Sequence, residues 1–104
     1  MSDAKKILVV EDEAHLAKGL QFNLEREGYV VSLVDNGESA IELLSEEAFD
    51  LMILDIMLPN LNGIEVARRV RNTDLRFPIL MLSAKSSDED RELGLEAGAD
   101  DYLT

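Results

Sequence analysis

Four side chains that can bind a cation or a phosphoryl group stand directly after short apolar runs of this chain. Each run has four residues: Glu11 and Asp12 follow the first, Asp55 follows the second, and Ser83 follows the third. Continuous apolar runs bounded by polar residues are typical of strands buried on both faces of a parallel sheet. The carboxyl ends of parallel strands share one edge, where open α/β folds bind ligands. The sequence therefore predicts that three carboxylates and a hydroxyl meet in one pocket.

A pocket of this kind predicts a divalent cation. Two carboxylates about 5 Å apart repel by roughly 3 kcal/mol at an effective dielectric constant of about 20, so the group must raise its pKa values or bind a cation. Oxygen ligands without histidine or cysteine favour a hard ion, and few protein ligands with room for water favour Mg²⁺ over Ca²⁺. Magnesium held by carboxylates takes its other ligands from water and phosphate oxygens, which indicates phosphoryl chemistry. The chain has no glycine-rich phosphate loop of the Walker or dinucleotide type.

Asp55 is the best candidate nucleophile, because an aspartate can form an acyl phosphate and Asp55 ends the most apolar strand. As an isolated residue it could simply open a turn, an interpretation that the other polar strand ends weaken. Glu11 or Asp12 could instead cap the helix that follows, where their charge is favourable, and one of them could do both. Ser83 could be an ordinary strand-end hydroxyl.

The elements that must position these residues alternate between strand and helix. Strands are expected at 6–10, 29–34, 51–54, 79–82 and from 102 onward, and helices between Asp12 and Gly28 and at 38–47, 64–72 and 88–97. The first helix should bury a stripe formed by Leu16, Ala17, Leu20 and Leu24. The alternation predicts parallel βαβ units with right-handed crossovers. The fold class is α/β with a doubly wound five-stranded parallel sheet, and of the two common strand orders we favour 2-1-3-4-5.

Composition excludes several classes of function. A net charge of −12 from 22 acidic and 10 basic residues disfavours direct binding of nucleic acid or anionic lipid. The chain has no cysteine, which excludes disulfides and thiolate metal sites. It also has no apolar run of membrane-spanning length and no signal-peptide core, so we expect a single soluble cytoplasmic domain.

The chain resembles the response-regulator receiver domains of bacterial two-component signalling. The matching motifs are ILVVEDE at 7–13, DIMLPNLNG at 55–63, ILMLSAK at 79–85 and GADDYLT at 98–104. The resemblance implies the sheet order 2-1-3-4-5, Mg²⁺ as cofactor and a sensor histidine kinase as phosphodonor. Its last motif resembles receivers fused to winged-helix transcription factors, which implies a DNA-binding effector domain in the parent protein. A receiver catalyses its own phosphotransfer and turns over no external substrate, so it is not counted as an enzyme.

Carried over residue by residue, the resemblance implies a complete set of site residues. They are Asp55 as phosphoacceptor, Glu11, Asp12, Asp55 and the backbone carbonyl of Met57 as metal ligands, Ser83 as switch hydroxyl, and Tyr102 as switch aromatic. Glu11 stands where the family often has aspartate, so it is expected to reach the metal through water. The side chain of Met57 either shields the phosphoryl group from hydrolysis or is simply exposed.

Two surface features are open to more than one interpretation. Phe22 on the first helix is either a harmless exposed aromatic or part of a kinase-docking surface. Arg68, Arg69 and Arg71 are interpreted as a solvated helix face.

The resemblance places the family's conserved lysine directly after Thr104, and a fifth helix beyond it. We therefore interpret 1–104 as one receiver domain that stops before both. On this interpretation Mg²⁺ binds, but phosphorylation is slow, uncoupled from Ser83 and Tyr102, or absent. The sheet face covered by the first helix alone should expose apolar surface, which predicts marginal stability or self-association.

Two alternatives to a phosphorylatable receiver are considered. One is a truncated, phosphorylation-impaired fragment that acts as a binding or scaffold module. The other is a Mg²⁺-dependent aspartyl-phosphate hydrolase, which needs a second carboxylate shortly after the nucleophile as acid–base. Ile56 and Met57 follow Asp55 instead, which argues against the hydrolase.

Overall fold

The computed structural model describes residues 4–73, 77–82 and 88–103, with the backbone alone at 88–91 and 102–103. Its elements are β1 Lys6–Val10, α1 Ala14–Arg26, β2 Val30–Val34, α2 Gly37–Glu46, β3 Leu51–Leu54, α3 Gly63–Arg71, β4 Ile79–Leu82, α4 Asp88–Ala97 and β5 Asp101–Leu103. All neighbouring strands are parallel, and the sheet has the order β2-β1-β3-β4-β5. The predicted fold class and strand order are confirmed.

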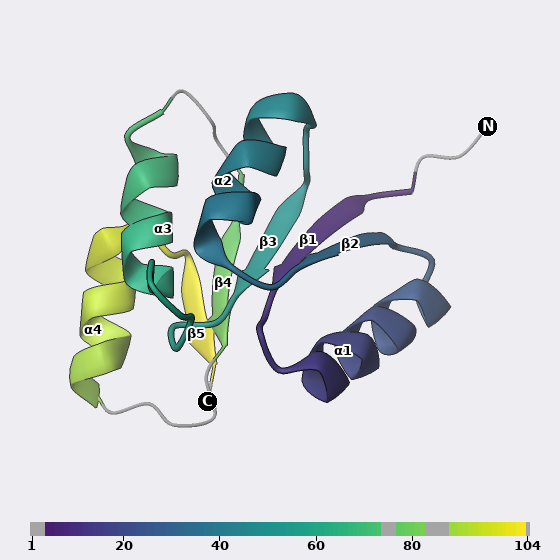
Figure 1. The fold of residues 1–104 in the computed structure, drawn as a ribbon, viewed down its shortest axis with the longest axis horizontal. Helices are drawn as coiled ribbons and strands as arrows, with labels where there is room; N and C mark the ends of the chain where they lie inside the picture. The colour runs from purple at the N-terminus through teal and green to yellow at the C-terminus, as the bar shows by residue number, and fades with distance from the viewer. Residues whose placement is uncertain (1–3, 74–76, 83–87, 104) are drawn as a thin grey trace.

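The sheet separates two apolar cores (Figure 1). Along β1, Leu8 and Val10 belong to the larger core, beneath α2, α3 and α4, whereas Ile7 and Val9 belong to a smaller core on the side of α1. These four side chains are at most 2% exposed. A strand buried on both faces explains why its sequence is continuously apolar rather than alternating.

The register of the sheet brings the ends of the first three strands level. Val10 pairs with Val34 on one side and with Leu54 on the other. The backbone pairing continues one residue further, because the N–H of Asp55 donates to the carbonyl of Val10 at 3.1 Å. Residues that follow β1 and β3 therefore leave the sheet side by side.

The helix starts correct two predictions. The N-cap of α1 is Glu13, whose carboxylate accepts from the backbone N–H of His15 at 3.2 Å and of Leu16 at 2.9 Å. The prediction that Glu11 or Asp12 caps this helix is therefore wrong, because the chain turns into the helix only after both.

α2 and α3 each begin one residue earlier than predicted. Asn36 and Asn62 are their N-caps, and the side-chain oxygens accept from the N–H of Ser39 at 2.7 Å and of Glu65 at 3.0 Å. A glycine follows each cap as the first helical residue. For α3 the sequence carries a helix-start signal, because Glu65 follows Asn62 by three residues.

α1 buries few of its side chains against its face of the sheet. Ala17 is its only residue classed as buried, Leu20 and Leu24 pack partly buried against the smaller core, and Leu16 is 42% exposed. The predicted buried stripe is thus wrong for Leu16, which lies in the first turn of the helix. The helix ends before Gly28 as predicted, and the φ of +96° at Gly28 is a left-handed conformation that favours glycine.

An apolar groove of about 480 Å³ lies beside α1. Its lining residues are Lys5, Ile7, Leu24, Tyr29, Asp50, Leu51, Ile53 and Leu80. Among the described helices, only α1 lies on this face of the sheet (Figure 1). The expected apolar opening is present, whereas marginal stability and self-association stay predictions.

None of the helices within the described ranges is long and apolar enough to cross a membrane.

Candidate functional site

The carboxylates of Glu11, Asp12 and Asp55 meet at the carboxyl edge of the sheet. Each offers one oxygen, and these oxygens all lie within 4.8 Å of one another. Glu11 and Asp12 follow β1 and Asp55 follows β3, so the level strand ends bring together residues more than forty positions apart. The predicted convergence of these three side chains is present in the structure.

Backbone hydrogen bonds hold two of the three carboxylates. The N–H of Glu13 donates to the Glu11 carboxylate at 3.0 Å, and the N–H of Met57 donates to Oδ1 of Asp55 at 3.2 Å. Both donors stand two residues after the carboxylate that accepts from them. The turns that end β1 and β3 therefore orient these two carboxylates through backbone donors.

Burial and charge act together on Glu11, which is 7% exposed. Desolvation, with a smaller contribution from the neighbouring charge of Asp55, raises the pKa of Glu11 from 4.5 to about 7. None of the ion pairs formed within the described part of the chain involves Glu11, Asp12 or Asp55. The negative charge of this cluster is therefore not balanced by any described side chain.

The donor set fits a small hard cation. Three carboxylates, with no histidine or cysteine, favour Mg²⁺ or Ca²⁺ over transition metals. The cluster offers few protein ligands, and Asp12 is exposed to solvent. Because Mg²⁺ usually keeps several waters and is bound by one or two carboxylates plus phosphate oxygens, it suits this site better than Ca²⁺.

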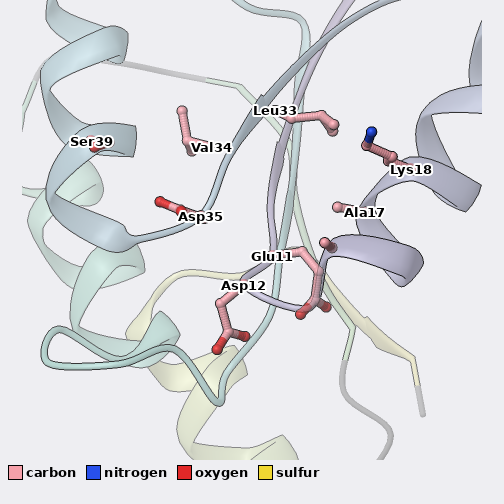
Figure 2. Close-up of a pocket in the computed structure, with 9 residues that line it drawn as sticks. Glu11, Asp12, Ala17, Lys18, Leu33, Val34, Asp35 and Ser39 are labelled. Carbon is pink, nitrogen blue, oxygen red and sulfur yellow. The ribbon is translucent and has the colours of Figure 1, made fainter.

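Open hollows flank the cluster on two sides. One, of about 450 Å³, lies between the starts of α1 and α2, with Glu11 and Asp12 at one end and the ammonium group of Lys18 at the other (Figure 2). The second, of about 500 Å³, extends from Asp12 along residues 56–59 to Asn62 and Ile64. The cluster is thus accessible to water and to small ligands.

The predicted roles of three further residues are not tested by the described part of the structure. Ser83 lies outside the described residues, and of Tyr102 only the backbone is described, paired with Met81 in the sheet. The side chain of Met57 is 60% exposed beside the cluster, and both interpretations of it stay predictions.

Phe22 is 62% exposed on α1, with the guanidinium of Arg26 at 5.7 Å from the ring centre. Its docking role and its interpretation as a harmless exposed aromatic both stay predictions.

A family model described as "Response regulator receiver domain" matches residues 7–104. The alkaline phosphatase synthesis transcriptional regulatory protein PhoP of Bacillus subtilis is 54% identical over 100 residues, which are 96% of this chain and 42% of PhoP. The chain thus spans less than half the length of this relative.

Solved structures give the same result. A putative response regulator from Chloroflexus aurantiacus has a TM-score of 0.92 at 35% identity, covering 97% of this chain and 84% of its own. The receiver domain of the sensor histidine kinase PA1611 from Pseudomonas aeruginosa, solved with a magnesium ion in its active-site cleft, has a TM-score of 0.89 at 34% identity, with the same two coverages. The chain belongs to the family of response-regulator receiver domains.

Proposed function

We propose that this chain is a phosphoacceptor signalling domain that takes a phosphoryl group from a sensor histidine kinase onto Asp55. The supporting observation is the meeting of three carboxylates within 4.8 Å, without a described cation beside them. A cluster of this composition stabilises an incoming phosphoryl group only together with a metal ion, because the carboxylates alone repel it.

We assign separate roles in metal binding and phosphotransfer to these residues. Glu11, Asp12, Asp55 and the backbone carbonyl of Met57 would hold Mg²⁺, and Glu11 would do so through water. When bound, Mg²⁺ neutralises oxygens of the phosphoryl group and of the acceptor carboxylate. A carboxylate oxygen of Asp55 attacks phosphorus, an acyl phosphate bond forms, and the bond between phosphorus and the donor's imidazole nitrogen breaks.

The output of the domain is proposed from its relatives. PhoP is a transcriptional regulatory protein, and this chain matches 42% of its length. We propose that Ser83 moves its hydroxyl toward the phosphoryl group, that Tyr102 turns its ring inward, and that a DNA-binding effector domain of the parent protein responds. The magnesium ion in the related PA1611 receiver supports the choice of metal.

Incubation with acetyl phosphate and Mg²⁺, followed by intact-mass measurement, tests the proposal. We expect the mass of one phosphoryl group to appear only when Mg²⁺ is present and to be absent from Asp55→Asn. Beryllofluoride with Mg²⁺ provides a second reading, because it forms a stable phosphoryl mimic on the acceptor. Mg²⁺ binding without any mass gain or beryllofluoride response would reject phosphotransfer and favour the binding-module alternative.

A further inference from the structure

Gly63, the first residue of α3, lies directly against the peptide that follows Asp55. A Cβ atom on Gly63 would overlap the carbonyl oxygen of Asp55 and lie 2.9 Å from the carbonyl carbon of Asp55 and from the Cα of Ile56. The φ angle of Gly63 is not positive, so an alanine could adopt this backbone conformation. Glycine is therefore required at position 63 because a Cβ atom would overlap the backbone of Asp55, and not because the φ angle excludes other residues.

Neither partner in this contact can easily move away. On one side, Leu54 is fully buried and the N–H of Asp55 is bonded to Val10. On the other side, α3 is anchored by the fully buried Val66 and Ala67, and the N–H of Gly63 donates to the carbonyl of Ile56 at 3.0 Å. A side chain on Gly63 must therefore be accommodated mainly by rotation of the peptide between Asp55 and Ile56.

Rotation of this peptide would displace the carboxylate of Asp55. The same peptide leads to Met57, whose N–H holds Oδ1 of Asp55 at 3.2 Å. Turning it changes both the backbone torsion of Asp55 and the direction of this hydrogen bond. Functional groups tolerate displacements of only about 0.5 Å before a site weakens, and Mg²⁺ requires near-ideal octahedral geometry.

We infer that Gly63 is a positioning residue: because it has no side chain, α3 seats against the Asp55–Ile56 peptide and sets where the Asp55 carboxylate lies relative to Glu11 and Asp12. The inference rests on the proposed function for its purpose, although the contact itself does not. It adds a residue from the start of α3 to the determinants of the site.

Gly37, at the start of α2, makes a second close approach to the same connection. A Cβ atom on Gly37 would lie 2.5 Å from Cγ2 of Val66 and 2.9 Å from the carbonyl oxygen of Leu61. The connection from Asp55 to α3 is therefore restrained at its start by Gly63 and near its end by Gly37. Substitution of Gly37 is expected to be milder, because its nearest contact is a side-chain methyl group rather than backbone.

The matched control is Gly98, which follows α4. Its φ is +122°, and a Cβ atom there would overlap the side chain of Arg71, so Gly98→Ala is also destabilising. It lies at the other edge of the sheet, since the neighbouring Asp100 N–H bonds to Ile79 at the start of β4. Comparison of the two variants separates loss of stability from loss of position.

The experiment records amide spectra and Mg²⁺ titrations of the whole chain as wild type, Gly63→Ala, Gly37→Ala and Gly98→Ala. Trimethylamine N-oxide at one concentration in every sample keeps destabilised variants folded, and urea melts report the stability of each. The amide resonance of Met57, assigned with Asp55→Asn as reference, reports the acceptor turn without any metal.

We expect Gly63→Ala to shift the Met57 amide and to weaken Mg²⁺ binding by about tenfold or more, and Gly37→Ala to act in the same direction with a smaller effect. Gly98→Ala should leave the Met57 amide in place and the affinity within about twofold of wild type. An unmoved Met57 amide in folded Gly63→Ala would overturn the inference, as would equal losses of affinity in Gly63→Ala and Gly98→Ala.

Failure of the proposed function gives a different pattern. If wild type itself binds no Mg²⁺, the metal-dependent function is rejected, and the Met57 amide alone decides the positioning role. If Gly63→Ala does not fold even with the osmolyte, Gly37→Ala decides, and an unmoved Met57 amide in that variant rejects the inference.

Discussion

Two acidic side chains at the amino edge of the sheet are paired with cations, whereas the three clustered carboxylates at the carboxyl edge have no ion-pair partner among the described residues. At the amino edge, Asp100 accepts from Nη2 of Arg71 and from the N–H of Ile79, both at 2.7 Å. Lys6 similarly places its ammonium 2.7 Å from Glu47. At the carboxyl edge, the three clustered carboxylates face one another within 4.8 Å, and no described ion pair includes them.

In a chain of net charge −12, the role of an acidic residue depends on whether a cation lies beside it. The acidic groups at the amino edge contribute to stability because each has a cation within ion-pair distance. Acidic groups that remain crowded without a cation reduce stability, because desolvation and mutual repulsion oppose their ionisation. Such a cluster is therefore a functional candidate, and the two edges should respond with opposite signs when a charge is removed.

The largest effect on stability is expected at Glu11 when Mg²⁺ is absent. Its pKa is about 7 in the folded chain against 4.5 when exposed, so the folded state holds the proton more tightly. The stabilisation from the protonated group is complete below pH 4.5 and is lost as pH rises to about 7. The total is at most about 3 kcal/mol.

Urea melts between pH 4.5 and 8 measure this effect as the difference between wild type and Glu11→Gln. We expect wild type to lose stability relative to the variant as pH rises, and Mg²⁺ to restore it near pH 7.5 by binding the ionised cluster. A difference that stays constant with pH would contradict the account of Glu11.

The opposite edge should respond in the other direction. Arg71→Ala removes the bonds to Asp100 and to the carbonyl of Gly98, together with the stacking of its guanidinium 5.9 Å from the ring centre of Phe77. We expect a loss of about 1–2 kcal/mol in the free energy of unfolding. Arg69→Ala, whose guanidinium lies 3.7 Å from Glu65 on the exposed face of the same helix, is the control and should change stability by less than about 0.5 kcal/mol.

A smaller effect, on rate rather than stability, is expected at Met57. If its 60% exposed side chain shields the acyl phosphate from water, Met57→Ala should speed dephosphorylation by a few fold. Decay of the phosphorylated mass with time, after removal of acetyl phosphate, measures this rate. An unchanged decay rate would leave Met57 as an ordinary exposed residue.

The smallest expected effect concerns the groove beside α1. Its apolar lining predicts weak self-association of two copies, visible by analytical ultracentrifugation as mass that rises with concentration. Leu80→Lys, which places a charge in the groove, should abolish the rise. A strictly monomeric wild type at all concentrations would contradict this prediction.

The sequence was sufficient to predict the strands and the cluster, because continuous apolar runs mark buried parallel strands and a shared direction forces their polar ends together. It could not decide which of three successive acidic residues caps α1. That choice depends on where the chain turns, and the structure assigns it to Glu13. Only this result shows that Glu11 and Asp12 do not cap the helix.

Contacts between distant segments were also beyond prediction. Arg71 was grouped with Arg68 and Arg69 as a solvated face, but it is bonded to the turn after α4, 27 residues away. The requirement for glycine at position 63 likewise depends on a backbone approach that no local pattern encodes. Both cases depend on how α3 sits against its neighbours.

Calorimetric titration with Mg²⁺ measures whether the carboxylate cluster is a metal site. We expect saturable one-to-one binding to wild type and a loss of at least about tenfold in affinity for Asp12→Asn, because a carboxylate ligand is removed. Asp35→Asn, which removes an acidic group from the same hollow but not from the cluster, should bind like wild type. Equal affinities for Asp12→Asn and wild type, or no binding to wild type, would contradict the account.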